Sequence, residues 1–310
     1  MIEVKDVTKR YGATLAVDHL SFQVQPGQVT GFLGPNGAGK TTTMRLLLGL
    51  AAPTAGQALV NHQPYPRLRR PLHQVGALLD ANAVHGGRSA RNHLRWIAQS
   101  NAIQGTRVAE VLELVGLGGV ARRRVGGFSL GMKQRLGIAA ALLGDPEILL
   151  LDEPVNGLDP EGIRWMRGLL KSLAAEGRTV FVSSHLMSEM ALMAHELIVV
   201  GRGRLIADTS LAEFVRRGAP SELVVRSPRG PELASLLTAR GASVAVATGG
   251  ALVVTGLDAA AVGELAAAHG IPLRELTPRS ASLEEVFMDV TGDRVDYRSN
   301  MPTQQRTRER

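Results

Sequence analysis

One short stretch constrains the fold of this chain more than any other, and it reads Gly34-Pro35-Asn36-Gly37-Ala38-Gly39-Lys40-Thr41. It has the form G-x-x-x-x-G-K-[ST] that is typical of a phosphate-binding loop. An apolar run at residues 29–33 precedes it and predicts a buried strand, and residues 42–50 follow with a helical pattern. A strand, a glycine loop and a helix in this order predict an α/β domain with a polyphosphate site at the loop.

Each residue type in this loop has a physical reason to be there. The glycines let the backbone wrap closely around a polyphosphate with its N–H groups pointing inward. The N-terminus of the following helix adds partial positive charge. Lys40 supplies a full charge to the β- and γ-phosphates, and the Thr41 hydroxyl can bind Mg²⁺. The alternative, a glycine-rich turn with a chance lysine, is disfavoured by the strand and helix on either side.

Composition narrows the class of protein. The chain is 45% hydrophobic and 20% charged, which is typical of a globular protein, and it has no cysteine, which excludes disulfides and thiolate metal sites. The first residues lack a signal-peptide pattern, and no apolar run reaches membrane-spanning length. We therefore expect a soluble protein in a reducing cytoplasm. The net charge of +7 would suit a nucleic acid or a membrane surface, but the arginines are scattered and cluster only at 67–70, 122–124 and 306–310. We interpret them as solvated surface.

Residues 1–217 read as one α/β domain. The predicted strands are residues 2–7, 16–24, 29–33, 57–60, 75–79, 148–151 and 179–183, with a hairpin at 196–200 and 204–207. An apolar stripe with helical spacing predicts a helical insertion at about residues 81–127. Further helices are predicted at residues 129–143, at 160–175 and from 185 onward.

A second unit is predicted after a boundary at Arg217-Gly218-Ala219-Pro220. Within residues 218–292, strands are predicted at 222–226, 243–247, 252–255 and 272–276, and helices at 231–240 and 258–269. This β-α-β-β-α-β order predicts a smaller, ferredoxin-like α+β domain at the C-terminal end. A final helix is predicted at 282–290, and the polar residues 293–310 are predicted to be disordered. The predicted strands contain no Phe, Tyr or Trp, so we expect no RNA-stacking surface.

Polar groups follow two of the predicted strands. Asp152 and Glu153 end the apolar run 148–151, which is where α/β sheets place ligand chemistry. One carboxylate there can hold Mg²⁺, and its neighbour can orient and deprotonate an attacking water. An acidic helix-capping pair is the alternative, disfavoured by the phosphate loop in the same chain. His185 lies just past the strand 179–183 and could reach a γ-phosphate, although alone it would be an ordinary residue near a helix start.

Residues 1–215 resemble the ATP-binding subunits of ABC (ATP-binding cassette) transporters. The phosphate loop, now extended to Thr42, the strand 148–151 with its two carboxylates, and His185 all match that family's motifs in the right order. Further matches are Tyr11, the signature-like run Phe128-Ser129-Leu130-Gly131-Met132-Lys133-Gln134-Arg135, and the loop Asn156-Gly157-Leu158-Asp159. The resemblance implies a P-loop NTPase of the ABC type with a helical insertion, an ATPase that uses ATP and Mg²⁺.

The resemblance also implies a role for each matching residue. Glu153 is implied as the catalytic base, with His185 as the switch histidine and Lys40 on the phosphates. Metal ligation is implied for Thr41 and Asp152. Tyr11 is implied to stack on adenine. The implied nucleotide-binding set is Tyr11, Gly34, Pro35, Asn36, Gly37, Ala38, Gly39, Lys40, Thr41, Thr42, Ser129 and Gly131.

Two departures from the family pattern affect these expectations. The signature has Leu130 and Met132 where the family has Gly and Gln, although Ser129 and Gly131 can still supply a hydroxyl and a backbone N–H. Asp80 stands where a glutamine is expected, and it can still bind Mg²⁺ or the attacking water. Both departures, the ferredoxin-like unit and the run Leu283-Glu284-Glu285-Val286-Phe287 resemble the drug- and antibiotic-exporter branch, of the bacitracin- or daunorubicin-resistance type.

The family's mechanism implies partners. ATP would lie between the phosphate loop of one copy and Ser129 and Gly131 of a second copy, so ATP closes a dimer and hydrolysis reopens it. Separate membrane permease subunits would receive that motion through the insertion at residues 80–125, which places the chain in the cytoplasm on the inner face of the membrane. We expect no nucleic-acid partner. The alternatives are a soluble ABC-type ATPase acting on ribosomes or DNA, and a nucleotide-binding regulator without turnover, which Glu153 argues against.

Overall fold

The computed structural model describes residues 1–217, 222–247, 249–279 and 283–291. Its centre is a sheet of order β5-β6-β7-β3-β8-β9, parallel except for β9. The strands are β3 (Val29–Leu33), β5 (Val75–Leu78), β6 (Ile148–Asp152), β7 (Thr179–Ser184), β8 (Glu196–Gly201) and β9 (Arg204–Ser210). The parallel strands are buried, as their near-continuous apolar sequence requires. This sheet carries the phosphate loop and confirms the predicted α/β class.

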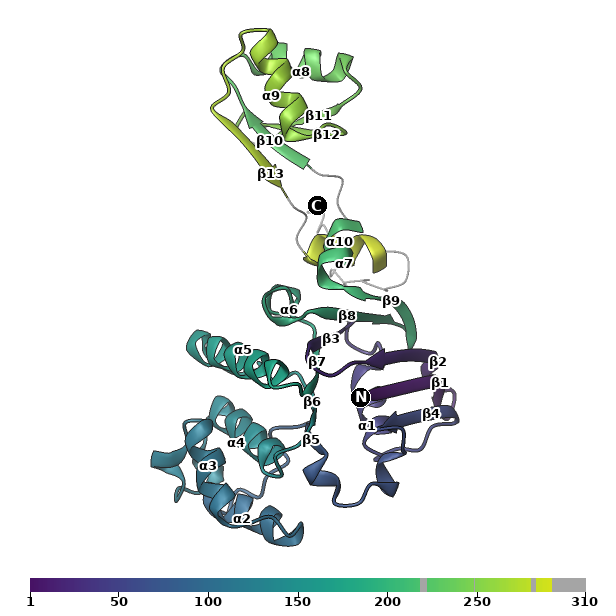
Figure 1. Cartoon of the computed structure of the whole chain (residues 1–310), viewed down its shortest axis with the longest axis vertical. Coiled ribbons are helices and arrows are strands. Elements are labelled where there is room, and N and C mark those ends of the chain that lie inside the picture. The colour runs from purple at the N-terminus through teal and green to yellow at the C-terminus, as the bar shows by residue number, and fades with distance from the viewer. Residues whose placement is uncertain (218–221, 248, 280–282, 292–310) are drawn as a thin grey trace, which may run out of the picture.

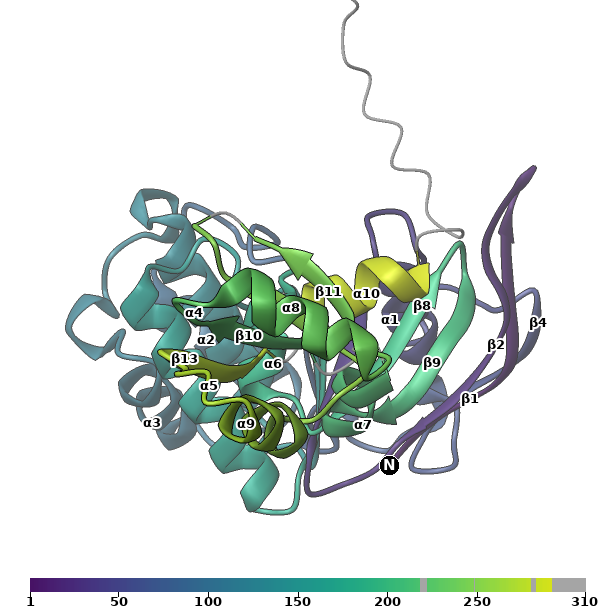
Figure 2. The same ribbon diagram turned by 90° about the horizontal axis from the view of Figure 1, so that it is seen from above.

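A second, antiparallel sheet of order β2-β1-β4 lies along one side of the molecule, and the helical insertion lies on the other (Figure 2). It consists of β1 (Ile2–Tyr11), β2 (Thr14–Val24) and β4 (Ala55–Val60). Phe22 of β2 packs on Phe32 of β3 and Phe181 of β7, with its ring centroid 5.6 Å from each of theirs. Aromatic contacts of this kind join the two sheets into one core. The first strand continues to Tyr11, four residues past its predicted end, through irregular pairing with β2.

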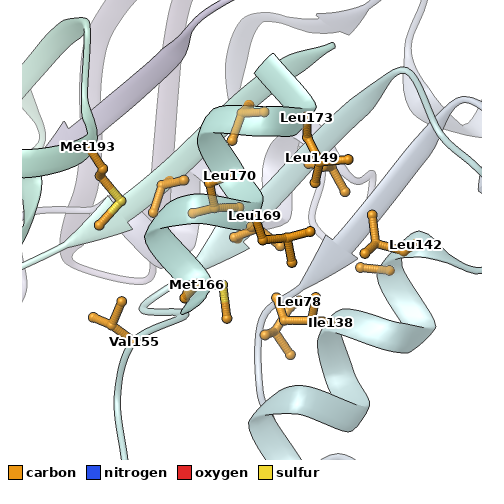
Figure 3. Packing of buried hydrophobic residues seen from close by; sticks show 14 of the residues in the cluster. Leu78, Ile138, Leu142, Leu149, Val155, Met166, Leu169, Leu170, Leu173 and Met193 are labelled. Carbon is orange, nitrogen blue, oxygen red and sulfur yellow. The ribbon is translucent and has the colours of Figure 1, made fainter. Parts of the chain in front are cut away.

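Helices cover the face of the central sheet opposite β2. They are α4 (Leu130–Leu142), α5 (Pro160–Ala175) and α6 (Met187–Met193), while α1 (Lys40–Leu47) lies between the two sheets. Figure 3 shows Ile138 and Leu142 of α4 against Leu78, and Leu169 and Leu170 of α5 in the same core. The last of the three helices starts at Met187 rather than at His185, because Leu186 is extended and its N–H donates to the Ser184 hydroxyl.

The predicted helical insertion is present at one end of the molecule (Figure 1). It contains α2 (Ala90–Ser100), α3 (Thr106–Leu114) and single 3₁₀ turns at Gly118–Val120 and Val125–Gly127. Ser89 caps α2, since its hydroxyl accepts a hydrogen bond from the Asn92 N–H at 3.2 Å. Leu94 and Val111 are fully buried in the same cluster as the central sheet, so the insertion shares the core of the cassette.

The C-terminal unit is ferredoxin-like, as predicted. Its elements are β10 (Glu222–Arg226), α8 (Gly230–Ala239), β11 (Ser243–Val246), β12 (Leu252–Thr255), α9 (Ala259–Ala268) and β13 (Glu275–Arg279), in an antiparallel sheet of order β11-β12-β10-β13. The last strand was predicted at 272–276 and lies three residues later. Pro272 has no N–H for a ladder, and the Pro278 inside the strand is tolerated because β13 is an edge.

Two short helices lie between the central sheet and this unit (Figure 1). They are α7 (Leu211–Arg217) and α10 (Leu283–Thr291), which pack on each other, and α10 also packs on α6. Phe214, Val286 and Phe287 belong to the core cluster of the central sheet, so the chain returns to the cassette after the C-terminal unit. Of the predicted boundary 217–220, residues 218–220 lie outside the described residues, as does the tail 293–310.

Candidate nucleotide-binding site

The phosphate loop joins β3 to α1, and its glycines are required by the surrounding protein. A Cβ on Gly39, where φ is 99°, would lie 2.6 Å from the Ala16 carbonyl, and one on Gly34 would lie 2.4 Å from the Val200 carbonyl. The loop also accepts a hydrogen bond from the Gly203 N–H to the Ala38 carbonyl, at 3.1 Å. The turn between β8 and β9 therefore supports the phosphate loop. The glycines are required by this packing as well as by the close approach of phosphate that the sequence predicted.

A cavity of about 280 Å³ opens over this loop. It is lined by residues 36–42 of the loop and helix α1, by Asp152 and Glu153, and by Ala16 and Leu79. Ala16 and Leu79 were not predicted as site residues, because nothing in their type or spacing distinguishes them from other strand residues. Backbone N–H groups, one cation and two carboxylates therefore meet at the carboxyl end of the central strands, where α/β sheets bind ligands.

Lys40 is the cation of this cavity, and it is almost fully buried. Its ammonium donates to the Gly34 carbonyl at 2.6 Å and to the Pro35 carbonyl at 3.2 Å. Burial lowers the pKa of the Lys40 ammonium, and the carboxylates of Glu153 and Asp152 oppose that shift. A buried cation satisfied by two carbonyls is positioned to exchange those contacts for phosphate oxygens.

Asp152 joins three elements of the site. One of its carboxylate oxygens accepts from the Thr41 hydroxyl at 2.7 Å, and the other accepts from the Ser183 hydroxyl. A hydroxyl and a carboxylate are ligands that Mg²⁺ prefers, so these oxygens fit a magnesium site beside the loop. Ser183 was not predicted, although its position at the end of β7 is the same strand-end signal that identified Asp152.

Glu153 has an unusual backbone. Its φ is 50°, which is strained for a residue with a side chain, and three polar groups hold it there. Its N–H donates to the Ser183 carbonyl and hydroxyl, and its carbonyl accepts from the Gln134 side chain at 3.0 Å. Its carboxylate lies 2.9 Å from His185 Nδ1. The predicted base and the predicted switch histidine are therefore in contact. The structure also adds the buried Gln134, whose location no sequence signal indicated.

Seven predicted residues are not among those that line this cavity: Gly34, Pro35, His185, Ser129, Gly131, Tyr11 and Asp80. The carbonyls of the first two accept from the Lys40 ammonium, and His185 contacts Glu153. The Ser129 hydroxyl caps α4 by accepting from the Met132 N–H, and a Cβ on Gly131 would lie 3.0 Å from the Gly157 carbonyl. Tyr11 is half-exposed under the Lys9 ammonium. The Asp80 carboxylate accepts from the Asn82 N–H at 2.8 Å. One chain therefore brings together the loop, the predicted metal ligands and the predicted base, but not the signature residues.

Comparison with known proteins agrees with this geometry. The family description "ABC transporter" matches residues 17–156, and a domain of unknown function, DUF8746, matches residues 221–284. The chain is 43% identical to the bacitracin transport ATP-binding protein BcrA of Bacillus licheniformis over 220 residues, 70% of this chain and 72% of that protein. It is 37% identical to the Nod factor export ATP-binding protein I of Burkholderia orbicola over 306 residues, 94% and 97% of the two chains.

A solved structure of the ATP-binding subunit of an ABC transporter matches with a TM-score of 0.64 at 26% identity, covering 70% of this chain and 92% of that one. The fold and site define a P-loop ATPase of the ATP-binding cassette class. The chain belongs to the ABC transporter family, as an ATP-binding and ATP-hydrolysing subunit of the drug- and antibiotic-exporter branch. These relatives are transport subunits, which favours this function over a cassette ATPase of ribosomes or DNA.

Proposed function

We propose that two copies of this chain enclose ATP and Mg²⁺ between them and drive export through separate membrane permease subunits. The observation that carries the proposal is the incomplete cavity, in which the loop, Asp152 and Glu153 meet while Ser129 and Gly131 lie elsewhere on the same chain. A second copy presenting its own Ser129 and Gly131 would complete the enclosure. The names of the relatives support a drug, antibiotic or lipid-like compound as the exported substrate.

The residues of the site divide the chemistry between them. Loop N–H groups and Lys40 bind the phosphates, and Tyr11 stacks on the adenine. Thr41 and Asp152 would hold Mg²⁺, with Asp80 acting through water, and the metal when bound neutralises charge on the β- and γ-phosphates. The Glu153 carboxylate takes the proton of the attacking water, and His185 keeps that carboxylate in place through the 2.9 Å contact.

The partners follow from the same proposal. No helix in the part of the chain that the structure describes is long and apolar enough to cross a membrane. Membrane attachment is therefore assigned to the permease, which holds the chain as a peripheral subunit on the inner face. The helical insertion is the surface proposed for that contact.

Glu153→Gln tests the proposal most directly. It removes the base but keeps the size and the contacts of the side chain, so turnover should fall by roughly 10²–10⁴-fold while ATP binding persists. Analytical ultracentrifugation with ATP should then show an accumulated dimer. Lys40→Ala is the contrasting variant, because it should lose ATP binding and remain monomeric. Turnover of Glu153→Gln at the parent rate would show that another group is the base.

A further inference from the structure

The structure brings together two arginine-rich segments that are about thirty residues apart in the sequence. The Arg91 N–H donates to the Ala121 carbonyl at 2.8 Å, and the Val125 N–H donates to the Arg88 carbonyl at 2.9 Å. These bonds hold the start of α2 beside the turn that precedes α4. The arginine cluster formed there consists of Arg88, Arg91, Arg95, Arg122, Arg123 and Arg124.

These guanidinium groups have no carboxylate partner in the part of the chain that the structure describes. All but Arg88 are exposed, and within the described residues no ion pair joins any member of the cluster to Asp or Glu. Some other arginines of the cassette are paired, such as Arg107 and Arg178 with Asp145, and Arg167 with Glu189. A concentration of unpaired like charge repels itself and is stabilised by an anionic partner.

The surface beside the cluster is partly apolar. A hollow of about 360 Å³ is lined by Arg91, Arg122 and Arg123 over buried Leu112, with Glu113 also in its wall. Trp96 is 53% exposed, and the Arg88 guanidinium lies 4.7 Å from its ring centroid. Tryptophan and arginine together suit the boundary between water and lipid, where one part of each side chain is apolar and the other polar.

We propose that the arginine cluster and Trp96 dock on anionic lipid headgroups of the inner membrane leaflet beside the permease. The proposal rests on the proposed function, which brings the insertion to the membrane. Charge favours lipid over the permease as the partner of this cluster, because cytoplasmic loops of membrane proteins carry an excess of Lys and Arg and would repel it. The proposed permease contact is therefore assigned to the rest of the insertion. Lipid phosphates complement the cluster, since a guanidinium binds phosphate oxygens bidentately. The sequence alone indicates solvated surface for the arginines, whereas this proposal gives six of them anionic lipid as a ligand.

Flotation of the full chain with lipid vesicles tests this surface without nucleotide or permease. One set of vesicles is pure phosphatidylcholine, and the other contains equal parts of phosphatidylcholine and phosphatidylglycerol. The wild type should float with the anionic vesicles at low salt and less at high salt. The combined Arg91→Gln, Arg122→Gln and Arg123→Gln variant should lower that partition on the order of 100-fold, because each arginine near an anionic surface contributes several-fold.

The matched control removes the same charge from another exposed cluster, by Arg67→Gln, Arg69→Gln and Arg70→Gln. It should float like the wild type, and both triple variants should keep the wild-type ATPase rate measured without membranes. Equal loss in both variants, or undiminished flotation of the cluster variant, would overturn the proposal. So would a wild type that ignores anionic vesicles while the cluster variant fails to assemble with the permease, since the partner would then be protein. None of these outcomes bears on the Glu153→Gln result, which tests the proposed function separately.

Discussion

The helical insertion and the ferredoxin-like unit lie at opposite ends of the molecule, and they are joined to the nucleotide-binding sheet in different ways (Figure 1). The insertion has no separate core, because Leu94 and Val111 pack in one cluster with Leu151 at the site strand. The C-terminal unit has its own cluster, which includes Leu237 and Val254. The helix α10 follows this unit in the chain, and it packs in the core of the cassette rather than in the core of the unit.

The cassette and the C-terminal unit also differ in where non-glycine residues have positive φ. The non-glycine residues with positive φ in the described parts of the chain, Glu153 and Arg202 among them, all lie in the cassette. In the described C-terminal unit the positive φ values belong to glycines, such as Gly241 and Gly256. Strained backbone persists where surrounding contacts over-determine it, and it clusters at functional sites. The comparison teaches that changes in the insertion or α4 can reach Glu153, whereas changes inside the C-terminal unit should not.

The largest effect on stability should come from α10, the helix that lies between the central sheet and the C-terminal unit. Phe287 of α10 packs in the cassette core, so Phe287→Ala should destabilise the cassette by about 3–5 kcal/mol. Leu237→Ala in the C-terminal core should cost about 2–5 kcal/mol in that unit alone. Calorimetry with and without ATP distinguishes them, because ATP raises the unfolding temperature of the part that binds it. If Leu237→Ala lowers the ATP-sensitive transition as much as Phe287→Ala, the two parts unfold together.

A smaller effect is expected where α4 meets the site. Gln134 is 4% exposed and donates to the Glu153 carbonyl, so Gln134→Ala should lower turnover by about 10-fold, the equivalent of one hydrogen bond. ATP affinity should change little, because Gln134 does not line the cavity. Gln99→Ala on the exposed side of α2 is the control and should be silent. Loss of ATP affinity together with turnover would mean that Gln134 supports the phosphate loop instead.

The next effect is on the magnesium dependence of turnover, and it concerns Asp80, which precedes the helical insertion. If Asp80 acts on the metal through water, Asp80→Ala should raise the Mg²⁺ concentration for half-maximal turnover a few-fold, and Asp80→Gln should restore much of the activity. Magnesium titrations of the ATPase rate measure both. The Asp80 carboxylate also accepts from the Asn82 N–H, so thermal stability must be recorded alongside. An unchanged magnesium dependence in both variants would place Asp80 outside the site.

The smallest effect is expected in the hairpin that leads towards the C-terminal unit. Burial raises the pKa of the Asp208 carboxyl above its usual value. Its ionised form is therefore disfavoured in the folded state. This cost is present at neutral pH, fades as pH falls through the raised folded pKa and is gone below the unfolded pKa. Asp208→Asn should raise the unfolding temperature at neutral pH by about 1 °C, with no gain in acid. Thermal scans at several pH values measure this, and a gain that persists in acid would rule out the ionisation as its cause.

Local signals determined a large part of this protein. The phosphate loop, the apolar strands and the carboxylates at a strand end could be predicted because each depends on a few consecutive residues. The β-α-β-β-α-β order likewise identified the ferredoxin-like unit, since periodicity and turns are local properties. Even the shift of β13 has a local cause in its prolines.

Contacts between distant residues required the tertiary structure. The sequence does not show that Gly39 faces the Ala16 carbonyl, that Gln134 is buried under Glu153, or that Ser183 shares Asp152 with Thr41. The sequence placed the final helix with the C-terminal unit, but its apolar face packs on α6 and α7. The arginines are scattered along the sequence, and only the fold shows that Arg91 and Arg123 line the same hollow of the insertion. Local patterns specify which face of each element is apolar, whereas the pairing of those faces depends on how the whole chain packs.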